Sequence, residues 1–170
     1  MSASSHTGIR LAAVLCILCC SLASHAQEQP RIGILEFTAH TSAQNAWTDT
    51  VLEQLRAQIR EELVSHDISV IPPGELPEQL PPISIYDVDK LSKSSWNNLK
   101  GVHGLTKFVI GTVENHKTGE TSLSLAWIFP ESGRIMKPAA ITLNAGIDPS
   151  ETIVRKFARY ASDVIRAGAR

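Results

Sequence analysis

Two short segments of the 170-residue chain are apolar at almost every position, and they constrain the fold most. Arg31–Phe37 (RIGILEF) and Thr106–Val113 (TKFVIGTV) show little alternation between polar and apolar residues. A strand of this kind is buried on both faces, whereas a strand with one wet face alternates. We therefore expect a sheet that is covered on both sides, with Thr106–Val113 as a central strand.

Helical periodicity follows the first strand and also closes the chain. From about residue 42 to residue 65, one arc of about 160° holds Trp47, Val51, Leu52, Leu55, Ile59 and Leu63, and Arg60 faces away. Asp148-Pro149-Ser150-Glu151 predicts the start of a final helix, with Asp148 as N-cap. Its apolar arc consists of Ile153, Val154, Phe157, Ala161, Val164 and Ile165. Residues 87–103 predict a weaker helix that ends at Gly101.

Three further segments have the features of strands. Ile68–Ile71 is a short apolar run, and Thr121–Phe129 alternates after a turn that contains Gly119. Arg134–Leu143 returns the chain, and Pro138 places this strand at a sheet edge because proline donates no hydrogen bond. The predicted fold is an α/β (α+β) domain. Its elements follow the order β-α-β-α-β-β-β-α, and its helices pack on a mixed five-stranded sheet.

The first 26 residues have the pattern of a secretory signal peptide. Arg10 precedes an apolar run over Leu11–Leu22, and Ala-Ser-His-Ala follows it. We expect cleavage between Ala26 and Gln27, so that residues 27–170 form one domain in the periplasm or outside the cell. The alternative is a lipoprotein anchored through Cys20. Against it, bulky residues precede Cys20, where lipid modification requires small ones.

Composition excludes several classes of function. The formal net charge of −1 gives no basic surplus for nucleic acid. All three cysteines lie in the first 20 residues, so cleavage would leave no thiol for a disulfide or a metal site. Beyond the leader, no apolar run reaches the roughly 20 residues that span a membrane.

Two stretches resemble a known envelope domain. RIGILEF with its following helix resembles the opening of the amino-terminal domain of the translocation protein TolB. GVHGLTKFVIGTVENHKTGETSLSLAWIFPESGRIM resembles that domain's closing hairpins, although Glu36 stands where the TolB-like strand usually has proline. The pattern is also similar to small secreted proteobacterial proteins of uncharacterised function. The resemblance implies a non-catalytic envelope module that works through contacts with other proteins.

Candidate contact residues fall into three groups. Glu36 lies near the carboxyl end of the first strand, where open α/β sheets place ligands, and it is either a ligand contact, a general base or an acid at an exposed strand end. Leu76 and Leu80 lie in the proline-rich segment 72–82, which is either a partner site or a spacer. Arg155, Arg159 and Arg166 line the polar side of the last helix and either dock an acidic partner or face solvent.

No catalytic or metal-binding motif emerges from the sequence. The histidines at positions 40, 66, 103 and 116 lack the spacing of metal ligands, and no nucleophile elbow or phosphate loop is present. We therefore expect no cofactor and no metal. The leading hypothesis is an exported, non-catalytic accessory that binds envelope proteins. The alternatives are a periplasmic small-ligand carrier near Glu36 and a hydrolase assembled from distant residues.

Overall fold

A computed structural model describes residues 31–77, 80, 82–102, 104–137, 140–144 and 149–168. The predicted leader lies outside this part of the chain, as do His103, Pro138 and Asp148. Within the described part, no helix is long and apolar enough to cross a membrane.

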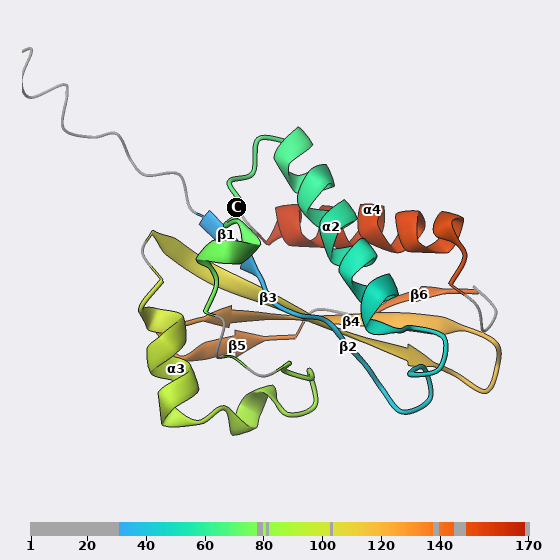
Figure 1. Cartoon of the computed structure of the whole chain (residues 1–170), viewed down its shortest axis with the longest axis horizontal. Coiled ribbons are helices and arrows are strands. Elements are labelled where there is room, and N and C mark those ends of the chain that lie inside the picture. Colours follow the sequence, from blue (N-terminus) through green and yellow to red (C-terminus); the bar gives the residue numbers. More distant parts are fainter. Residues whose placement is uncertain are drawn as a thin grey trace, which may run out of the picture.

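One mixed sheet forms the centre of the molecule (Figure 1). Its strands are β1 (Arg31–Ile34), β2 (Thr38–Ala39), β3 (Leu105–Asn115), β4 (Thr121–Phe129), β5 (Arg134–Met136) and β6 (Ile141–Leu143). β1 and β2 run parallel to β3, and β4 pairs antiparallel with β3, β5 and β6. The predicted α+β class is confirmed, with six strands in the sheet instead of five.

Three predicted strands differ from the observed ones. The first strand ends at Ile34 and pairing with β3 resumes at Thr38, so one expected strand becomes β1 and β2. Ile68–Ile71 makes only an isolated parallel bridge, between Val70 and Ile32. Within the predicted return strand Arg134–Leu143, the described residues form two strands, β5 up to Met136 and β6 from Ile141.

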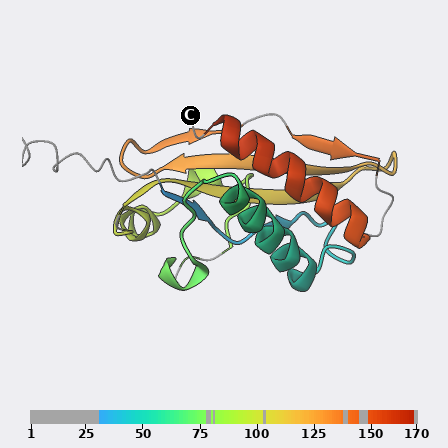
Figure 2. The ribbon, with the colours of Figure 1, turned by 90° about the horizontal axis from the view of Figure 1, so that it is seen from above.

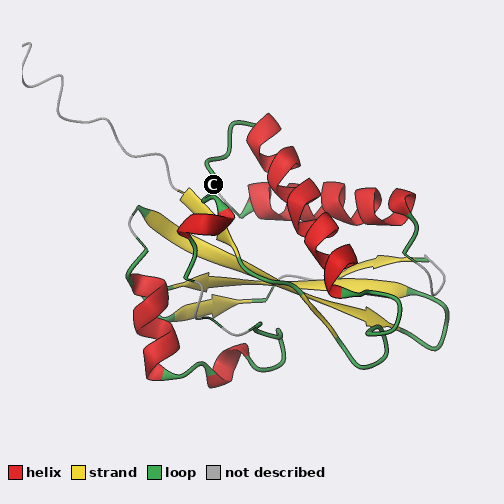
Figure 3. Cartoon of the chain, viewed as in Figure 1, coloured by secondary structure: helices red, strands yellow, loops and turns green. Residues whose placement is uncertain are grey.

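The described part of the chain contains three α-helices beside the sheet, and Figure 3 shows where they lie. They are α2 (Asp49–Ser65), α3 (Lys93–Lys100) and α4 (Glu151–Ala167), with short 3-10 turns at η1 (Pro73–Glu75) and η2 (Val88–Lys90). α2 begins seven residues later than the predicted position 42, because residues 41–46 form turns. The N-cap of α4 is Ser150 and not the predicted Asp148.

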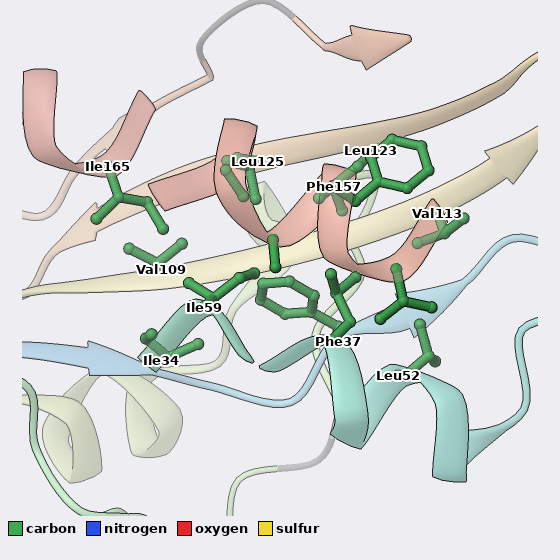
Figure 4. Packing of buried hydrophobic residues seen from close by; sticks show 14 of the residues in the cluster. Ile34, Phe37, Leu52, Ile59, Val109, Val113, Leu123, Leu125, Phe157 and Ile165 are labelled. Atoms are coloured by element: carbon green, nitrogen blue, oxygen red, sulfur yellow. The ribbon is translucent and has the colours of Figure 1, made fainter. Parts of the chain in front are cut away.

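Helices cover both faces of the sheet, as the apolar segments Arg31–Phe37 and Thr106–Val113 predicted. α2 and α4 lie side by side on one face, and α3 lies on the other (Figures 1 and 2). Side chains alternate along β3, so that Val109 and Val113 join the α2–α4 core while Phe108 and Ile110 join the core under α3. Figure 4 shows the first of these cores, in which side chains of α2 and α4 meet the sheet.

The predicted helix faces are confirmed in their apolar part. Leu52, Leu55, Ile59 and Leu63 of α2 are buried. Val154, Phe157, Ala161 and Ile165 of α4 are buried as well. The polar face of α2 is different from the prediction: the Arg60 side chain, which was expected to face away, is only 14% exposed.

A buried lysine ties α4 to the sheet. Lys107 of β3 is 6% exposed, and its ammonium group donates a hydrogen bond to the carbonyl of Gly168 at the end of α4. The same ammonium lies 5.5 Å from the centre of the Trp127 ring, a cation–π contact. Burial lowers the pKa of Lys107, because a desolvated ammonium is less favourable than a hydrated one.

The packing of α4 predicts a large difference between two neighbouring positions. Phe157 is fully buried and meets Trp47 edge to face at 5.6 Å, whereas Tyr160 is 48% exposed. Phe157→Asp should lower the free energy of unfolding by about 3 kcal/mol or more, since it removes core volume and buries an unpaired carboxylate. Tyr160→Asp is the matched control and should stay within about 0.5 kcal/mol of the parent chain. Urea unfolding followed by tryptophan fluorescence measures both, and equal midpoints for the two variants would contradict the packing.

Candidate functional site

A groove of about 780 Å³ runs between the segment 36–39 and the first half of α2. The segment contributes Glu36, Phe37, Thr38 and Ala39, while Pro82 comes from the proline-rich segment. The remaining lining residues are Gln44, Trp47, Thr48, Asp49, Leu52, Glu53 and Arg56. The groove thus lies at the edge of the sheet, next to the carboxyl end of β1, which is a common ligand position in open α/β sheets.

Packing against β3 fixes the strand side of the groove. Leu35 donates its N–H to the carbonyl of Val109 at 2.9 Å, and the Thr38 hydroxyl meets the Thr112 hydroxyl at 2.8 Å. Between them, the Phe37 ring lies over Gly111, where a Cβ would come within 2.9 Å of the ring. Because Gly111 has no side chain, the Phe37 ring can pack against β3 at this position. Phe37 is therefore buried, while the neighbouring Glu36 is exposed.

The helix side of the groove carries a compact charge cluster. Glu53 pairs with Arg56 and, at 3.4 Å, with Arg60. The Arg56 and Arg60 side chains are only 11% and 14% exposed. Desolvation lowers the pKa of Arg60, an effect that Arg56 reinforces and Glu53 opposes. The carboxylates of Asp49 and Glu36 differ from that of Glu53, because neither makes a hydrogen bond or ion pair with another described residue.

A second hollow of about 290 Å³ adjoins the groove and shares Glu36 and Arg56 with it. Its other lining residues are apolar: Leu35, Pro73, Leu76, Pro77, Leu80 and Ile83. An ion pair of 2.8 Å between Arg31 and Glu75 holds η1 against β1 beside this hollow. The structure thus brings Glu36 to the same hollow as Leu76 and Leu80 of the proline-rich segment, about 40 positions further along the chain.

The arginines of α4 belong to a different surface. Arg155 pairs with Glu151 at 2.5 Å, and Arg166 pairs with Asp163 at 2.6 Å, in both cases within one turn of the helix. Arg159 is exposed between them. Exposed pairs of this kind contribute about 1 kcal/mol or less. The two hollows are lined by residues 35–39, which include β2, by α2 and the loop before it, and by the proline-rich segment, so the α4 arginines lie outside them.

A polar cluster beside the strand ends was not predicted from the sequence. Tyr86 donates its hydroxyl to Glu114 Oε2 at 2.6 Å, and the His40 ring stands edge-on to Tyr86 at 5.6 Å. His40 Nδ1 lies 3.4 Å from the Ser42 hydroxyl and 4.0 Å from Glu114 Oε1. Serine and carboxylate both face the same ring nitrogen, whereas a catalytic triad needs them on opposite nitrogens. The cluster therefore does not have the geometry of a serine hydrolase.

The other described histidines have ordinary structural contacts. His116 Nε2 lies 2.8 Å from the Ser122 hydroxyl across the β3–β4 hairpin. His66 stands at the end of α2, with Nδ1 at 2.8 Å from the carbonyl of Glu62. No group of three or more metal-ligating side chains occurs among the described residues.

Comparison with known proteins shows the fold only. No protein-family model and no curated protein matches the chain. The hypothetical protein CT253 from Chlamydia trachomatis is similar in structure, with a TM-score of 0.50 and 10% sequence identity, over 83% of this chain and 98% of CT253. The lipoprotein GNA1162 from Neisseria meningitidis has a TM-score of 0.49 and 14% identity, over 82% of this chain and 96% of GNA1162.

A third similar structure is the C-terminal domain of LpoB from Salmonella enterica. Its TM-score is 0.40 and its identity is 9%, over 75% of this chain and 91% of that domain. The likeness to CT253 places the arrangement of sheet and helices among known bacterial folds.

The polar cluster predicts a measurable property of Tyr86. Its hydrogen bond to the Glu114 carboxylate raises the pKa of the phenol, and burial and the negative charge add to this effect. Tyr86→Phe should therefore remove a tyrosinate absorbance change that lies above the usual range for a phenol. Glu114→Gln should move the Tyr86 transition to lower pH, and the exposed control Glu131→Gln should not. Ultraviolet titration measures all three, and a Tyr86 transition that is unmoved in Glu114→Gln would contradict the contact.

Proposed function

We propose that this chain is an exported, non-catalytic protein of the bacterial envelope that binds another protein through the groove beside β2. The observation that carries the proposal is the groove itself, which joins a sheet edge, an apolar floor and unpaired carboxylates. Such a combination of an apolar centre with a polar rim is typical of protein interfaces. The proposed contact residues are Glu36 in the groove and Leu76 and Leu80 in the adjoining hollow.

Export is the second part of the proposal, and it is supported by the sequence of residues 1–26. We expect the mature chain to begin at Gln27 and to be free in the periplasm or secreted, with lipid anchoring through Cys20 as the alternative. The resemblance of the first strand and the closing hairpins to the TolB amino-terminal domain supports an envelope module in the same way. The arginines of α4, including Arg159, offer a second, weaker contact surface.

A small ligand is the competing function, and the adjoining hollow favours it. Its volume of about 290 Å³ is close to the lower limit for small-molecule sites, and its walls are mainly apolar. A bound small molecule would raise the melting temperature of the purified chain by mass action. A thermal-shift screen of metabolites therefore separates the two functions, because a protein-binding groove predicts no hit.

Photo-crosslinking in the native host tests the proposal. A benzophenone amino acid at Gln44, which is exposed and lines the groove, should crosslink to one discrete envelope protein. The same amino acid at Lys117, exposed in the β3–β4 turn, is the matched control and should give no such product. The mass of the recovered chain reports whether it begins at Gln27. Crosslinks that are absent at Gln44, or equal at both positions, would contradict a groove-binding function.

A further inference from the structure

The groove contains an open edge of the sheet. β2 pairs with β3 on one side, in a register that sets Thr38 against Thr112 and Ala39 against Val113. His40 donates its N–H to the carbonyl of Val113 at 2.8 Å. In a parallel ladder, residues that direct both backbone groups toward one neighbour alternate with residues that direct both away from it. Thr38 therefore faces β3, and the N–H and C=O of Ala39 point outward into the groove.

The residues before β2 extend this open edge. Glu36 and Phe37 lie between the Leu35 and Thr38 pairings with β3, where one extra residue interrupts the alternation. Among the described residues, no backbone carbonyl accepts a hydrogen bond from the N–H of Glu36 or Phe37. Backbone groups without a partner among the described residues thus occur at Glu36, Phe37 and Ala39, on either side of the paired Thr38, within a segment of about 13 Å.

The groove provides more than an edge. α2 forms one wall and Pro82 contributes to another, while Phe37, Trp47 and Leu52 close the floor and are themselves only 5%, 2% and 4% exposed. A strand added along an edge gains affinity from main-chain hydrogen bonds and specificity from alternate side chains that enter such surfaces. An uncovered edge strand usually has features that prevent pairing with other chains, and charged side chains are one of them. Here Glu36 and Asp49 are those charges.

The charges also indicate what the slot accepts. Glu36, Asp49 and Glu53 contribute three carboxylates, against the single cation Arg56. Glu53 is paired with both Arg56 and Arg60, a cluster of formal charge +1, whereas the Glu36 and Asp49 carboxylates are without an ion-pair partner among the described residues and make the local formal charge −1. Both are exposed at the groove, and each would gain from a lysine or arginine placed between apolar residues of a bound strand.

We propose that the groove binds an extended, basic segment of a partner protein, which adds to the sheet as a strand beside β2. This inference rests on the proposed protein-binding function and specifies the partner's chemistry. The backbone of the segment pairs with the outward groups of Ala39. Its side chains on one face lie along the wall that α2 forms, and its cationic side chain lies between Glu36 and Asp49.

Three blocked, fluorescein-labelled peptides test the proposal on the purified exported chain. The first alternates valine and threonine around a central lysine, the second has glutamate in place of that lysine, and the third carries the lysine but is N-methylated at alternate amides. Fluorescence anisotropy should show binding of the lysine peptide and at least tenfold weaker binding of the other two. N-methylation preserves the side chains and prevents main-chain pairing, so it isolates the contribution of strand addition.

Three variants of the chain complete the experiment. Ala39→Pro removes only an N–H that points away from β3, and it should abolish binding of the lysine peptide while the fold persists. Glu36→Lys should weaken binding at least tenfold. Glu131→Lys makes the same charge change at an exposed turn and should leave binding unchanged. Circular dichroism and a urea midpoint show that each variant remains folded.

Several results would overturn the proposal. These are no binding of the lysine peptide, equal binding of the glutamate or N-methylated peptide, or binding that survives Ala39→Pro. A stable dimer of the peptide-free chain in analytical ultracentrifugation, lost in Ala39→Pro, would show instead that the edge pairs with a second copy. If peptides fail but Gln44 still crosslinks to an envelope protein, only the mode of binding is wrong. If peptides bind but no crosslink forms in the host, the proposed function is wrong.

Discussion

Burial of β3 on both faces is the constraint on which the rest of the structure depends. Phe108 and Ile110 point to one core, while Val109 and Val113 point to the other, and all four are fully buried. A strand of this kind is stable only when apolar layers cover both sides of the sheet. α2 and α4 supply one layer, and α3 with the neighbouring turns supplies the other.

The candidate site is a consequence of how the edge beside β3 is built. Gly111 lets the Phe37 ring lie flat on β3, and the extra residue at 36–37 separates β1 from β2. The chain then turns into α2, which lines the groove beside the short β2 strand. The packing of Phe37 on Gly111 and the extra residue at 36–37 therefore both shape the groove. Its outward backbone groups and its unpaired carboxylates arise from local packing and not from a sequence motif.

Sequence patterns predicted the parts of the fold that repeat along the chain. The apolar arcs of α2 and α4 and the two-sided burial of Thr106–Val113 follow from periodicity, because burial acts on every third or fourth residue of a helix and on each face of a strand. The return segment was predicted as one strand, whereas its described residues form β5 and β6.

The candidate site was predictable only in part. Glu36 was singled out because it follows a buried strand, which is a local property. The contact of Tyr86 with Glu114 joins residues 28 positions apart, and the hollow joins Glu36 to Leu80 across a proline-rich segment. Neither contact could be predicted from periodicity in the sequence, because each depends on the path of a loop. The low exposure of Arg56 and Arg60 on the polar side of α2 was equally hidden, because both cations are paired with Glu53.

Amide hydrogen exchange of β2, followed by NMR on the peptide-free chain, tests the central claim most directly. The Ala39 N–H points into the groove and should exchange at least about a hundredfold faster than the N–H groups of Thr38 and Val113, which face the paired strands. Protection of Ala39 equal to that of Thr38 would show that this edge of the sheet is already covered. In that case the groove would not be an open site for an added strand.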